Sequence, residues 1–303
     1  MMTDISQQIN AFGSHSPLQL LTNPFGPAVP LQLWLKRDDL LHPLVSGNKW
    51  RKLKYNLLAA QVQGFATLLT FGGAYSNHLY ATAAAGRAFG FRTVGVVRGN
   101  ELASQPRNKT LSFCETAGMQ LHFVDRETYR RKDDPDFLCE LQTRFDPCYV
   151  IPEGGTNDLA VCGTAEILPE IRLQLGHAPS YVCCAVGTGG TLAGLVQSAP
   201  ETTAVLGFLS LNAADFQLPF DVEPSGNVQL LTDYHFGGYA KKTSQLLDFI
   251  RDFEQRTGIL LEQVYTGKML YGVQDLARRG YFPKDATVVA IHTGGLQGRS
   301  GAL

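Results

Sequence analysis

Short apolar runs alternate with helical patterns along this chain, and glycines separate one from the next. The apolar run at 66–71 (ATLLTF) predicts a buried strand, and the Ala-rich stretch at 76–89, which ends before Gly90, predicts a helix. A second apolar run at 93–97 predicts the next strand. Strand, helix and strand in this order are typical of a βαβ unit.

The same alternation recurs through the rest of the chain. It favours the α/β class, with a mostly parallel twisted sheet between layers of helices. Ligands bind outside the carboxyl ends of such strands, so candidate chemistry is sought in the glycine-rich turns that follow them. Further strands are predicted at 120–124, 149–151, 181–186, 204–209 and 287–291, and a helix is predicted from Thr191.

Two segments lack this pattern. Residues 125–135 (DRETYRRKDDP) mix charges of both signs, which favours a solvated surface connection over a phosphate-binding patch. Residues 212–231 contain two prolines and few regular signals, so a loop is predicted there.

The composition is typical of a globular protein. Apolar residues make up 44% and charged residues 17% of the 303 positions, which excludes a disordered, collagen-like or coiled-coil chain. The formal charge is −1, so no global field favours nucleic acid or an anionic membrane. The first residues are polar, so no secretory signal is expected, and no apolar run reaches the roughly 18 residues that span a bilayer. We expect a soluble cytoplasmic protein without nucleic-acid or membrane partners.

The cysteines and histidines do not predict a metal site. The sequence contains no CxxC pair, no HExxH and no spaced cluster of histidines. Without a secretory signal, the cysteines are expected to be buried reduced thiols rather than disulfides. The six cysteines are at positions 114, 139, 148, 162, 183 and 184.

Lys49, in the segment GNKWRKL, is the first candidate for chemistry. If a helix begins near this lysine, Leu53, Leu57 and Ala60 follow on one face, so the amine shares an apolar stripe. Desolvation lowers the pKa of an amine, and a Schiff-base lysine or a general base requires the neutral form. The alternative is an ordinary basic helix end, where only the lysine stems cover apolar surface.

The second candidate is the turn TFGGAYSNH at 70–78. Its glycines let backbone N–H groups approach a ligand, and the following helix N-terminus favours an anion such as a carboxylate. The alternative is that Ser76 or Asn77 is simply the N-cap. His78 is either a base or a structural residue of the first helical turn.

The third candidate directly follows the apolar run YVCCAV and consists of Gly187, Thr188, Gly189, Gly190 and Thr191. Its amides and hydroxyls are suited to holding a phosphate. The segment lacks the last glycine of GxGxxG and the Walker lysine, which favours a single phosphomonoester over a dinucleotide or a nucleoside triphosphate. The alternative is a glycine-rich turn without a ligand.

The fourth candidate combines Tyr265 in VYTGK, Thr293 in IHTGG and the upstream Tyr239. Thr293 follows the predicted strand 287–291, so its hydroxyl is expected at the carboxyl edge of the sheet, where it can meet a ring nitrogen. The tyrosines are candidates for stacking on that ring or for proton transfer. The alternatives are core tyrosines and a turn threonine.

Together these candidates describe a pyridoxal phosphate site. At this point the sequence resembles the 1-aminocyclopropane-1-carboxylate deaminase and D-cysteine desulfhydrase family, within the tryptophan synthase β-like fold type II. The matching segments follow the family order between about residues 36 and 295. They are KRDDLLHPLVSGNKWRKL, TFGGAYSNH, PEGGTN, AVGTGGT, GILLEQVYTGK and AIHTGG.

The resemblance implies which residues hold the cofactor, pyridoxal 5′-phosphate. Lys49 is expected to form the Schiff base, and Asn77 to bond the phenolic oxygen. Residues 187–191 are expected to hold the phosphate. Tyr265 is expected to lie against the ring, and Thr293 to face the pyridine nitrogen.

The resemblance also implies a substrate side and a domain organisation. Ser76, Asn77 and His78 are expected to flank the substrate carboxylate, and Tyr239 with Tyr265 the reacting carbons; Lys49, Ser76, Tyr239 and Tyr265 form the expected catalytic set. A large domain (1–52 with 157–303) and a small βα domain (53–156), both three-layer αβα, are expected to enclose the site. A homodimer is expected.

Two departures from the family pattern bear on the reaction. Family members with deaminase activity are expected to carry a glutamate after the tyrosine (YEGK) and a leucine after the histidine (HLGG). This chain has Thr266 and Thr293 at these two positions. A carboxylate beside the pyridine nitrogen keeps it protonated and strengthens the electron sink, whereas a neutral hydroxyl need not. Because an unactivated cyclopropane demands more of that sink than expelling a thiolate, the expected reaction is β-elimination of D-cysteine to pyruvate, ammonia and sulfide.

Other functions stay open. Within the enzymes, the alternatives are 1-aminocyclopropane-1-carboxylate deaminase and another small amino acid lyase or racemase. A catalytically silent protein that binds pyridoxal phosphate is the alternative from another class, and a nicotinamide oxidoreductase is a third. The segment DYHFGGYAK also departs from the GYGxPN form associated with the family, which bears on the substrate.

Overall fold

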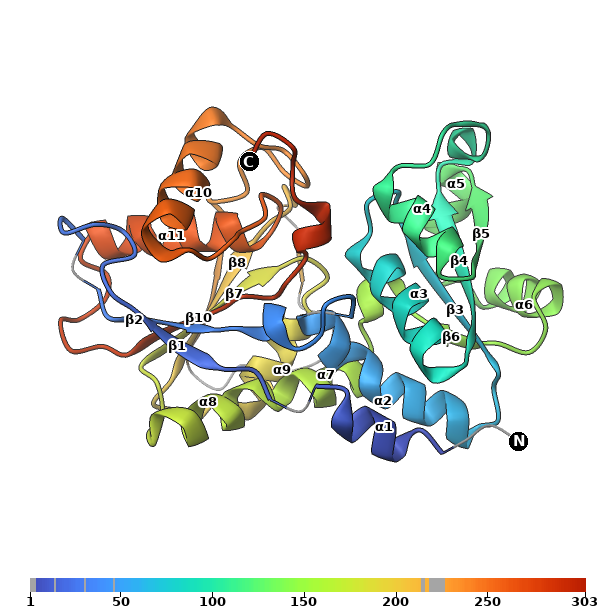
Figure 1. Cartoon of the computed structure of the whole chain (residues 1–303), viewed down its shortest axis with the longest axis horizontal. Helices are drawn as coiled ribbons and strands as arrows, with labels where there is room; N and C mark the ends of the chain where they lie inside the picture. Colours follow the sequence, from blue (N-terminus) through green and yellow to red (C-terminus); the bar gives the residue numbers. More distant parts are fainter. Residues whose placement is uncertain (1–3, 14, 30, 46, 214–215, 218–226) are drawn as a thin grey trace. The chain divides into compact units, whose positions relative to one another are not determined.

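The computed structural model describes residues 4–13, 15–29, 31–45, 47–213, 216–217 and 227–303. The chain divides into two compact units (Figure 1). The first unit comprises the described parts of 1–14 and 42–163, and the second those of 15–41 and 164–303. These boundaries differ from the predicted ones at 52/53 and 156/157, because the helix that carries Lys49 packs on the helix at 77–89 within the first unit.

The first unit is built on a parallel four-stranded sheet in the order β5-β4-β3-β6. Its strands are β3 (Thr67–Gly72), β4 (Arg92–Arg98), β5 (Met119–Val124) and β6 (Tyr149–Ile151). The helices are α1 (Ser6–Ala11), α2 (Asn48–Val62), α3 (Asn77–Phe89), α4 (Lys109–Thr116), α5 (Arg126–Arg130) and α6 (Pro135–Arg144), with α7 (Asp158–Ala165) at the boundary and the short turns η2 (Asn100–Ser104) and η3 (Glu153–Gly155).

Apolar clusters cover both faces of this sheet. On one face, residues of α3 and α4 such as Leu79 and Leu111 pack with Val97 of β4. On the other, Phe137 and Leu141 of α6 join a cluster with the strands β3 and β4. The first unit is therefore a three-layer αβα arrangement, as the alternation of strands and helices predicts.

The second unit is built on a six-stranded sheet in the order β1-β2-β10-β7-β8-β9, in which β1 pairs antiparallel and the other neighbours pair parallel. Its strands are β1 (Leu18–Leu21), β2 (Leu33–Lys36), β7 (Tyr181–Val186), β8 (Ala204–Leu209), β9 (Val228–Leu231) and β10 (Val288–Ile291). The helices are α8 (Ile167–Leu175), α9 (Gly190–Ser198), α10 (Ser244–Thr257) and α11 (Thr266–Arg278), with the short turns η1 (Asp38–Leu40) and η4 (Leu296–Gly298).

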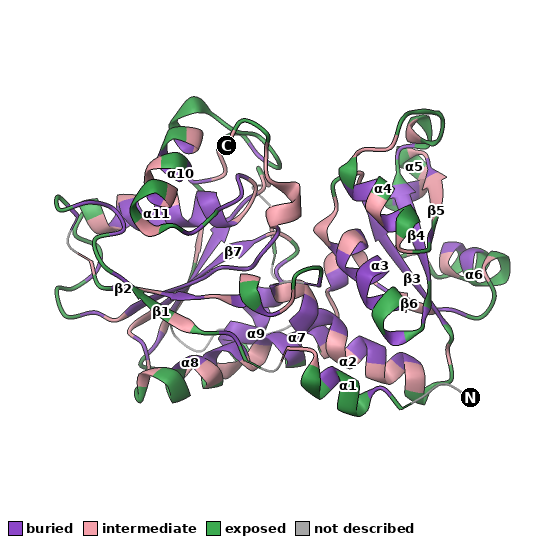
Figure 2. Ribbon diagram, viewed as in Figure 1, coloured by how far each residue is buried: buried purple, intermediate pink, exposed green. Residues whose placement is uncertain are grey.

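Alternate residues of the central strands serve opposite faces of this sheet. Cys183 packs in the cluster that includes residues of α10 and α11, whereas Cys184 packs in the cluster of α8 and α9. Figure 2 shows the central strands buried and the outer sides of the helices exposed. Strands buried on both faces read as continuous apolar runs, which is why YVCCAV lacks an alternating pattern.

The structure confirms the predicted strands and the helix at 76–89, in which Ser76 is the N-cap and Gly90 the C-cap in the left-handed region (φ 77°). Two predicted irregular segments need correction. Residues 125–135 contain α5, which Asp125 caps, and its Tyr129 is buried. The predicted loop at 212–231 contains β9; positions 214–215 and 218–226 of that segment lie outside the described residues.

The cysteines are also only partly as predicted. Cys139 on α6 and Cys162 on α7 are exposed, whereas the other four are buried. No disulfide joins any of them in the part of the chain that the structure describes. None of the described helices combines the length and the apolar composition that a bilayer crossing requires.

Candidate functional site

Lys49 lies in the first turn of α2, on the apolar stripe that the sequence predicts. Leu53, Leu57 and Ala60 are fully buried on that stripe, and Lys49 is half-buried. Burial lowers the pKa of the Lys49 amine from its usual 10.5 to about 8. The prediction of a desolvated amine is confirmed, and a sizeable neutral fraction is present near neutral pH.

Lys52, one helical turn after Lys49, is not among the predicted site residues. Its ammonium is buried and donates to the carbonyl of Gly154 at 3.0 Å and to Oγ1 of Thr156 at 2.9 Å. Burial, together with the charge of Lys49, holds the pKa of Lys52 well below its usual range. The PEGGTN segment is therefore fixed to the helix that carries Lys49. A buried position within the KWRK run is the signal that sequence reasoning overlooked.

The turn between β3 and α3 places Ser76 and Asn77 at the start of a helix. Ser76 Oγ accepts the backbone N–H of Leu79 at 3.2 Å, so the N-cap alternative describes its geometry. Asn77 is the first helical residue and is half-buried. The α3 N-terminus offers backbone donors to an anion, and the substrate role of both side chains stays a prediction.

His78 is a buried imidazole within the same turn. Its Nε2 lies 2.9 Å from Oγ1 of Thr70, whose hydroxyl donates to the carbonyl of Ile151 at 2.8 Å. Nε2 must therefore be the donor, which leaves Nδ1 as an acceptor without a partner among the described residues. Burial and the charges of Lys49 and Lys52 hold the pKa of His78 well below its usual value, so this ring is neutral.

The predicted phosphate cradle forms the turn between β7 and α9. Gly189 is the N-cap of α9 in the left-handed region (φ 86°), and it has no side chain to accept the first N–H groups of the helix. Gly190 and Thr191 are buried, and Thr188 is exposed. The turn thus offers backbone donors and the positive end of a helix dipole, the requirements of a bound phosphate.

Tyr265 lies directly against this cradle. A Cβ added to Gly187 would come 3.1 Å from Cε1 of Tyr265, closer than ordinary van der Waals contact, so the ring packs closely on the glycine. The ring of Tyr239 meets that of Tyr265 edge-on, with centroids 6.2 Å apart. Thr293 follows β10, which pairs parallel with β7, so it leaves the sheet at the same edge. The structure therefore brings together these predicted residues of the second unit.

Glu262 fixes the backbone that carries Tyr265, and sequence reasoning missed it. Its carboxylate accepts the backbone N–H groups of Val264, Tyr265 and Thr266 at 2.6, 2.8 and 2.6 Å. Burial raises the pKa of Glu262, and these hydrogen bonds and the charge of Lys268 oppose that shift. A glutamate just before a helix start is the signal that predicts such a cap.

Thr266, which follows Tyr265, carries a buried hydroxyl. Its side chain is fully buried, and its Oγ1 has no hydrogen-bond partner among the described residues. A buried polar atom without a partner costs free energy unless a ligand satisfies it. The hydroxyl is thus available to a polar group of a bound molecule.

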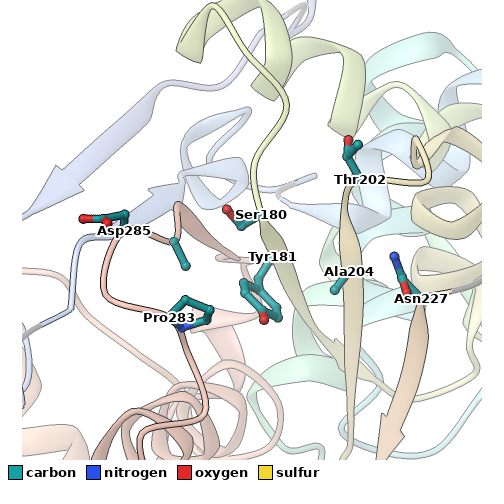
Figure 3. A pocket seen from close by; sticks show the side chains of 8 residues that line it. Ser180, Tyr181, Thr202, Ala204, Asn227, Pro283 and Asp285 are labelled. Atoms are coloured by element: carbon teal, nitrogen blue, oxygen red, sulfur yellow. The ribbon is translucent and has the colours of Figure 1, made fainter.

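A hollow of about 450 Å³ opens at the edge of the six-stranded sheet that is opposite to the predicted phosphate cradle (Figure 3). It lies at the amino ends of β7 and β8, whereas ligands of α/β sheets bind at the carboxyl ends. We therefore do not assign the site to this hollow. It is lined by Ser180, Tyr181, Thr202, Ala204, Asn227, Pro283, Asp285 and Ala286.

Comparison with known proteins decides the family. The model of the pyridoxal-phosphate dependent enzyme family matches residues 12–294. The chain belongs to this family. Its cofactor is pyridoxal 5′-phosphate, and its fold is the fold type II of these enzymes.

The relatives narrow the family further. A Pyrococcus horikoshii protein provisionally named 1-aminocyclopropane-1-carboxylate deaminase is 31% identical, over 93% of this chain and 90% of its own. The Arabidopsis thaliana mitochondrial bifunctional D-cysteine desulfhydrase/1-aminocyclopropane-1-carboxylate deaminase is 30% identical, over 90% of this chain and 75% of its own. A crystal structure of an ACC deaminase homologue is 28% identical, with a TM-score of 0.81 over 98% of this chain and 96% of the other. The chain is therefore a member of the deaminase and desulfhydrase group.

The residues present fit a pyridoxal phosphate. The glycine cap of α9 suits the phosphate, and the close contact between Tyr265 and Gly187 places an aromatic ring beside it. The hydroxyl of Thr266 lacks a protein partner among the described residues, and the Lys49 amine has the low pKa that reaction with an aldehyde requires.

Proposed function

We propose that this protein is a carbon-sulfur lyase that converts D-cysteine and water to pyruvate, ammonia and hydrogen sulfide. The observation that carries the proposal is the pair Thr266 and Thr293, two hydroxyl residues where the deaminating pattern has a glutamate and a leucine. Thr266 is buried with an available hydroxyl, and the nearest acid along the chain, Glu262, already accepts three backbone N–H groups. A ring nitrogen beside these residues meets hydroxyls rather than a free carboxylate.

In this proposal Lys49 holds the cofactor and moves protons. With a pKa of about 8, roughly a quarter of its amine is neutral at pH 7.5, against about one in a thousand for an ordinary lysine. When bound, pyridoxal phosphate supplies an aldehyde for amines and a ring that withdraws electrons from the α-carbon. Lys49 or a tyrosine then takes the α-proton of the substrate.

The other residues bind and orient. Residues 187–191 hold the phosphate, Asn77 bonds the phenolic oxygen, and Thr293 faces the ring nitrogen. Ser76 and the backbone donors of the α3 N-terminus hold the substrate carboxylate, since His78 is neutral and buried and cannot supply a charge. Tyr239 and Tyr265, which meet edge-on, confine the side chain of the substrate.

The proposal extends to the organisation of the protein. We propose that the chain works as a large domain of residues 1–52 and 157–303 and a small domain of 53–156, although the compact units group 1–14, 42–52 and 157–163 with the small one. We further propose that the enzyme is a cytoplasmic homodimer.

Ring opening of 1-aminocyclopropane-1-carboxylate is the second candidate. The names of the relatives favour it as strongly as the desulfhydrase reaction. It demands a stronger electron sink, so a carboxylate near the ring nitrogen would favour it over the thiolate elimination.

A substrate panel tests the proposal. Purified protein loaded with pyridoxal phosphate is assayed with D-cysteine, 1-aminocyclopropane-1-carboxylate, D-serine and L-serine, and Lys49→Ala is the control. We expect sulfide and pyruvate from D-cysteine, no turnover of the cyclopropane, and none by the control. Thr266→Glu with Thr293→Leu should raise turnover of the cyclopropane above background, because a carboxylate near the ring nitrogen strengthens the electron sink. Preferred turnover of the cyclopropane by the unaltered protein would favour the second candidate instead.

A further inference from the structure

Lys268 is a buried lysine of α11 for which the proposed reaction has no use. Its side chain is 1% exposed, and no described carboxylate lies within ion-pair distance of it, although the charge of Glu262 acts on it. Its ammonium instead donates to the carbonyls of His235 and Gly238, both at 2.8 Å, and more weakly to that of Ser210 at 3.4 Å. Three donors of one cation thus meet three backbone acceptors.

Two of these carbonyls belong to the first residues of consecutive turns, 235–238 and 238–241, and the second turn contains Tyr239. The N–H of Gly238 donates to the carbonyl of His235 at 3.0 Å, and the N–H of Lys241 donates to the carbonyl of Gly238 at 3.2 Å. Tyr239 is the second residue of the second turn. Lys268 therefore binds the first residue of each turn, and we call residues 235–241 the twin turn.

The backbone of the twin turn adopts conformations that are unfavourable in free energy. Phe236 and Ala240 adopt the left-handed region, with φ of 53° and 55°, although both carry a Cβ. Such conformations disfavour residues other than glycine. Gly238 has φ of 116°, and a Cβ there would come 3.3 Å from Cβ of Asn212. A segment with this geometry needs external contacts to hold one conformation.

Those contacts come from α11. Two helical turns beyond Lys268, Asp275 accepts the hydroxyl of Tyr234 at 2.7 Å, just before the twin turn. Tyr234 is buried, and its ring packs on Phe208. Burying an ammonium costs free energy that an apolar side chain at the same position would not. The hydrogen bonds to the twin turn offset this cost in free energy.

We propose that Lys268 is a positioning residue that holds the twin turn, presents Tyr239 to the substrate and so sets the rate of the reaction through Tyr239. The inference rests on the proposed function for the role of Tyr239. It does not rest on that function for the twin turn itself, since the contacts with Lys268 lie wholly within the second unit.

Limited trypsin digestion of the cofactor-loaded protein tests the structural half. Lys241 and Lys242 are exposed at the end of the twin turn, so cleavage after them reports its opening. Lys268→Met removes the donors while keeping the length of the side chain, and Lys284→Met, at an exposed position of the same unit, is the control. We expect cleavage at 241–242 to become at least fivefold faster in Lys268→Met and unchanged in the control. Equal rates in both would overturn the inference.

A double-mutant comparison tests the catalytic half with D-cysteine as the substrate. Lys268→Met should lower kcat about tenfold or more, because small displacements of a catalytic group are expensive. Adding it to Tyr239→Ala should cost less than a further twofold, because the residue on which Lys268 acts is already gone. Losses that multiply would show that Lys268 acts elsewhere and would refute the proposal.

Two safeguards keep the outcomes distinct. If Lys268→Met does not fold by circular dichroism, Lys268→Gln replaces it, with an amide that retains two donors on a shorter stem. If the unaltered protein turns over no amino acid, the proposed function fails, while the digestion still decides whether Lys268 holds the twin turn.

Discussion

Replacing Lys49 by methionine should remove a pH dependence from the stability of the cofactor-free protein. The folded pKa of Lys49 is about 8, and the unfolded chain has the usual 10.5. Between these two values the unfolded chain binds the additional proton, so stability rises with pH; it falls again as the pH drops toward the folded pKa. Below pH 8 both states are protonated and the dependence vanishes.

The magnitude follows from the shift. Each pH unit of this window adds about 1.36 kcal/mol, so a span of about 2.5 units adds at most about 3.4 kcal/mol. Because Lys49 is only half-buried, solvent screening reduces this, and we expect about 2 kcal/mol. Urea unfolding followed by circular dichroism at pH 7.5, 9 and 10.5 measures it in both proteins.

The difference between the two proteins reports Lys49 together with its charge effect on Lys52 and His78, whose pKa values it lowers. The free energy of unfolding should rise with pH more steeply in the unaltered protein than in Lys49→Met, with the gap opening above pH 8. Parallel curves would refute the argument that burial makes this amine reactive.

Two further substitutions, each paired with a control variant, test the placement of the first unit's helices. Ser76→Ala should destabilise the protein by about 1 kcal/mol in urea unfolding, because the cap on the Leu79 N–H is lost. Asp134→Ala, at the N-cap of α6, is the control and should cost a similar amount without affecting turnover. No activity loss in Ser76→Ala would remove Ser76 from the catalytic set. Gly163→Ala should cost about 3 kcal/mol, because its Cβ would lie 1.9 Å from the carbonyl oxygen of Arg51 on α2, whereas Gly301→Ala meets nothing; similar melting temperatures for these two variants would contradict the packing of α2.

The sequence predicts most strands of both sheets, because buried parallel strands appear in a sequence as short apolar runs between glycines. The runs at 66–71 and 181–186 correspond to β3 and β7 within a residue. Three strands were not predicted. β1 and β9 are edge strands that are short and only partly buried, and β2 is an inner strand of only four residues. Edge strands face solvent on one side, so their composition resembles that of loops.

The candidate residues are predictable where local pattern determines chemistry. Lys49 is recognisable from the apolar stripe that follows it, and the cradle after β7 from its glycines. Lys52 and Lys268 are not, because burial of a lysine depends on backbone carbonyls distant in sequence, at Gly154 and Gly238. Only the tertiary structure shows which of several lysines on a helix points inward.

Borohydride reduction of the cofactor-loaded protein, followed by peptide mapping, tests the central claim most directly. Three buried or half-buried lysines with lowered pKa compete for the cofactor: Lys49, Lys52 and Lys268. We predict a yellow protein that bleaches on reduction, with the label on Lys49 alone. A label on Lys52 or Lys268, or a colourless protein without label, would contradict the account.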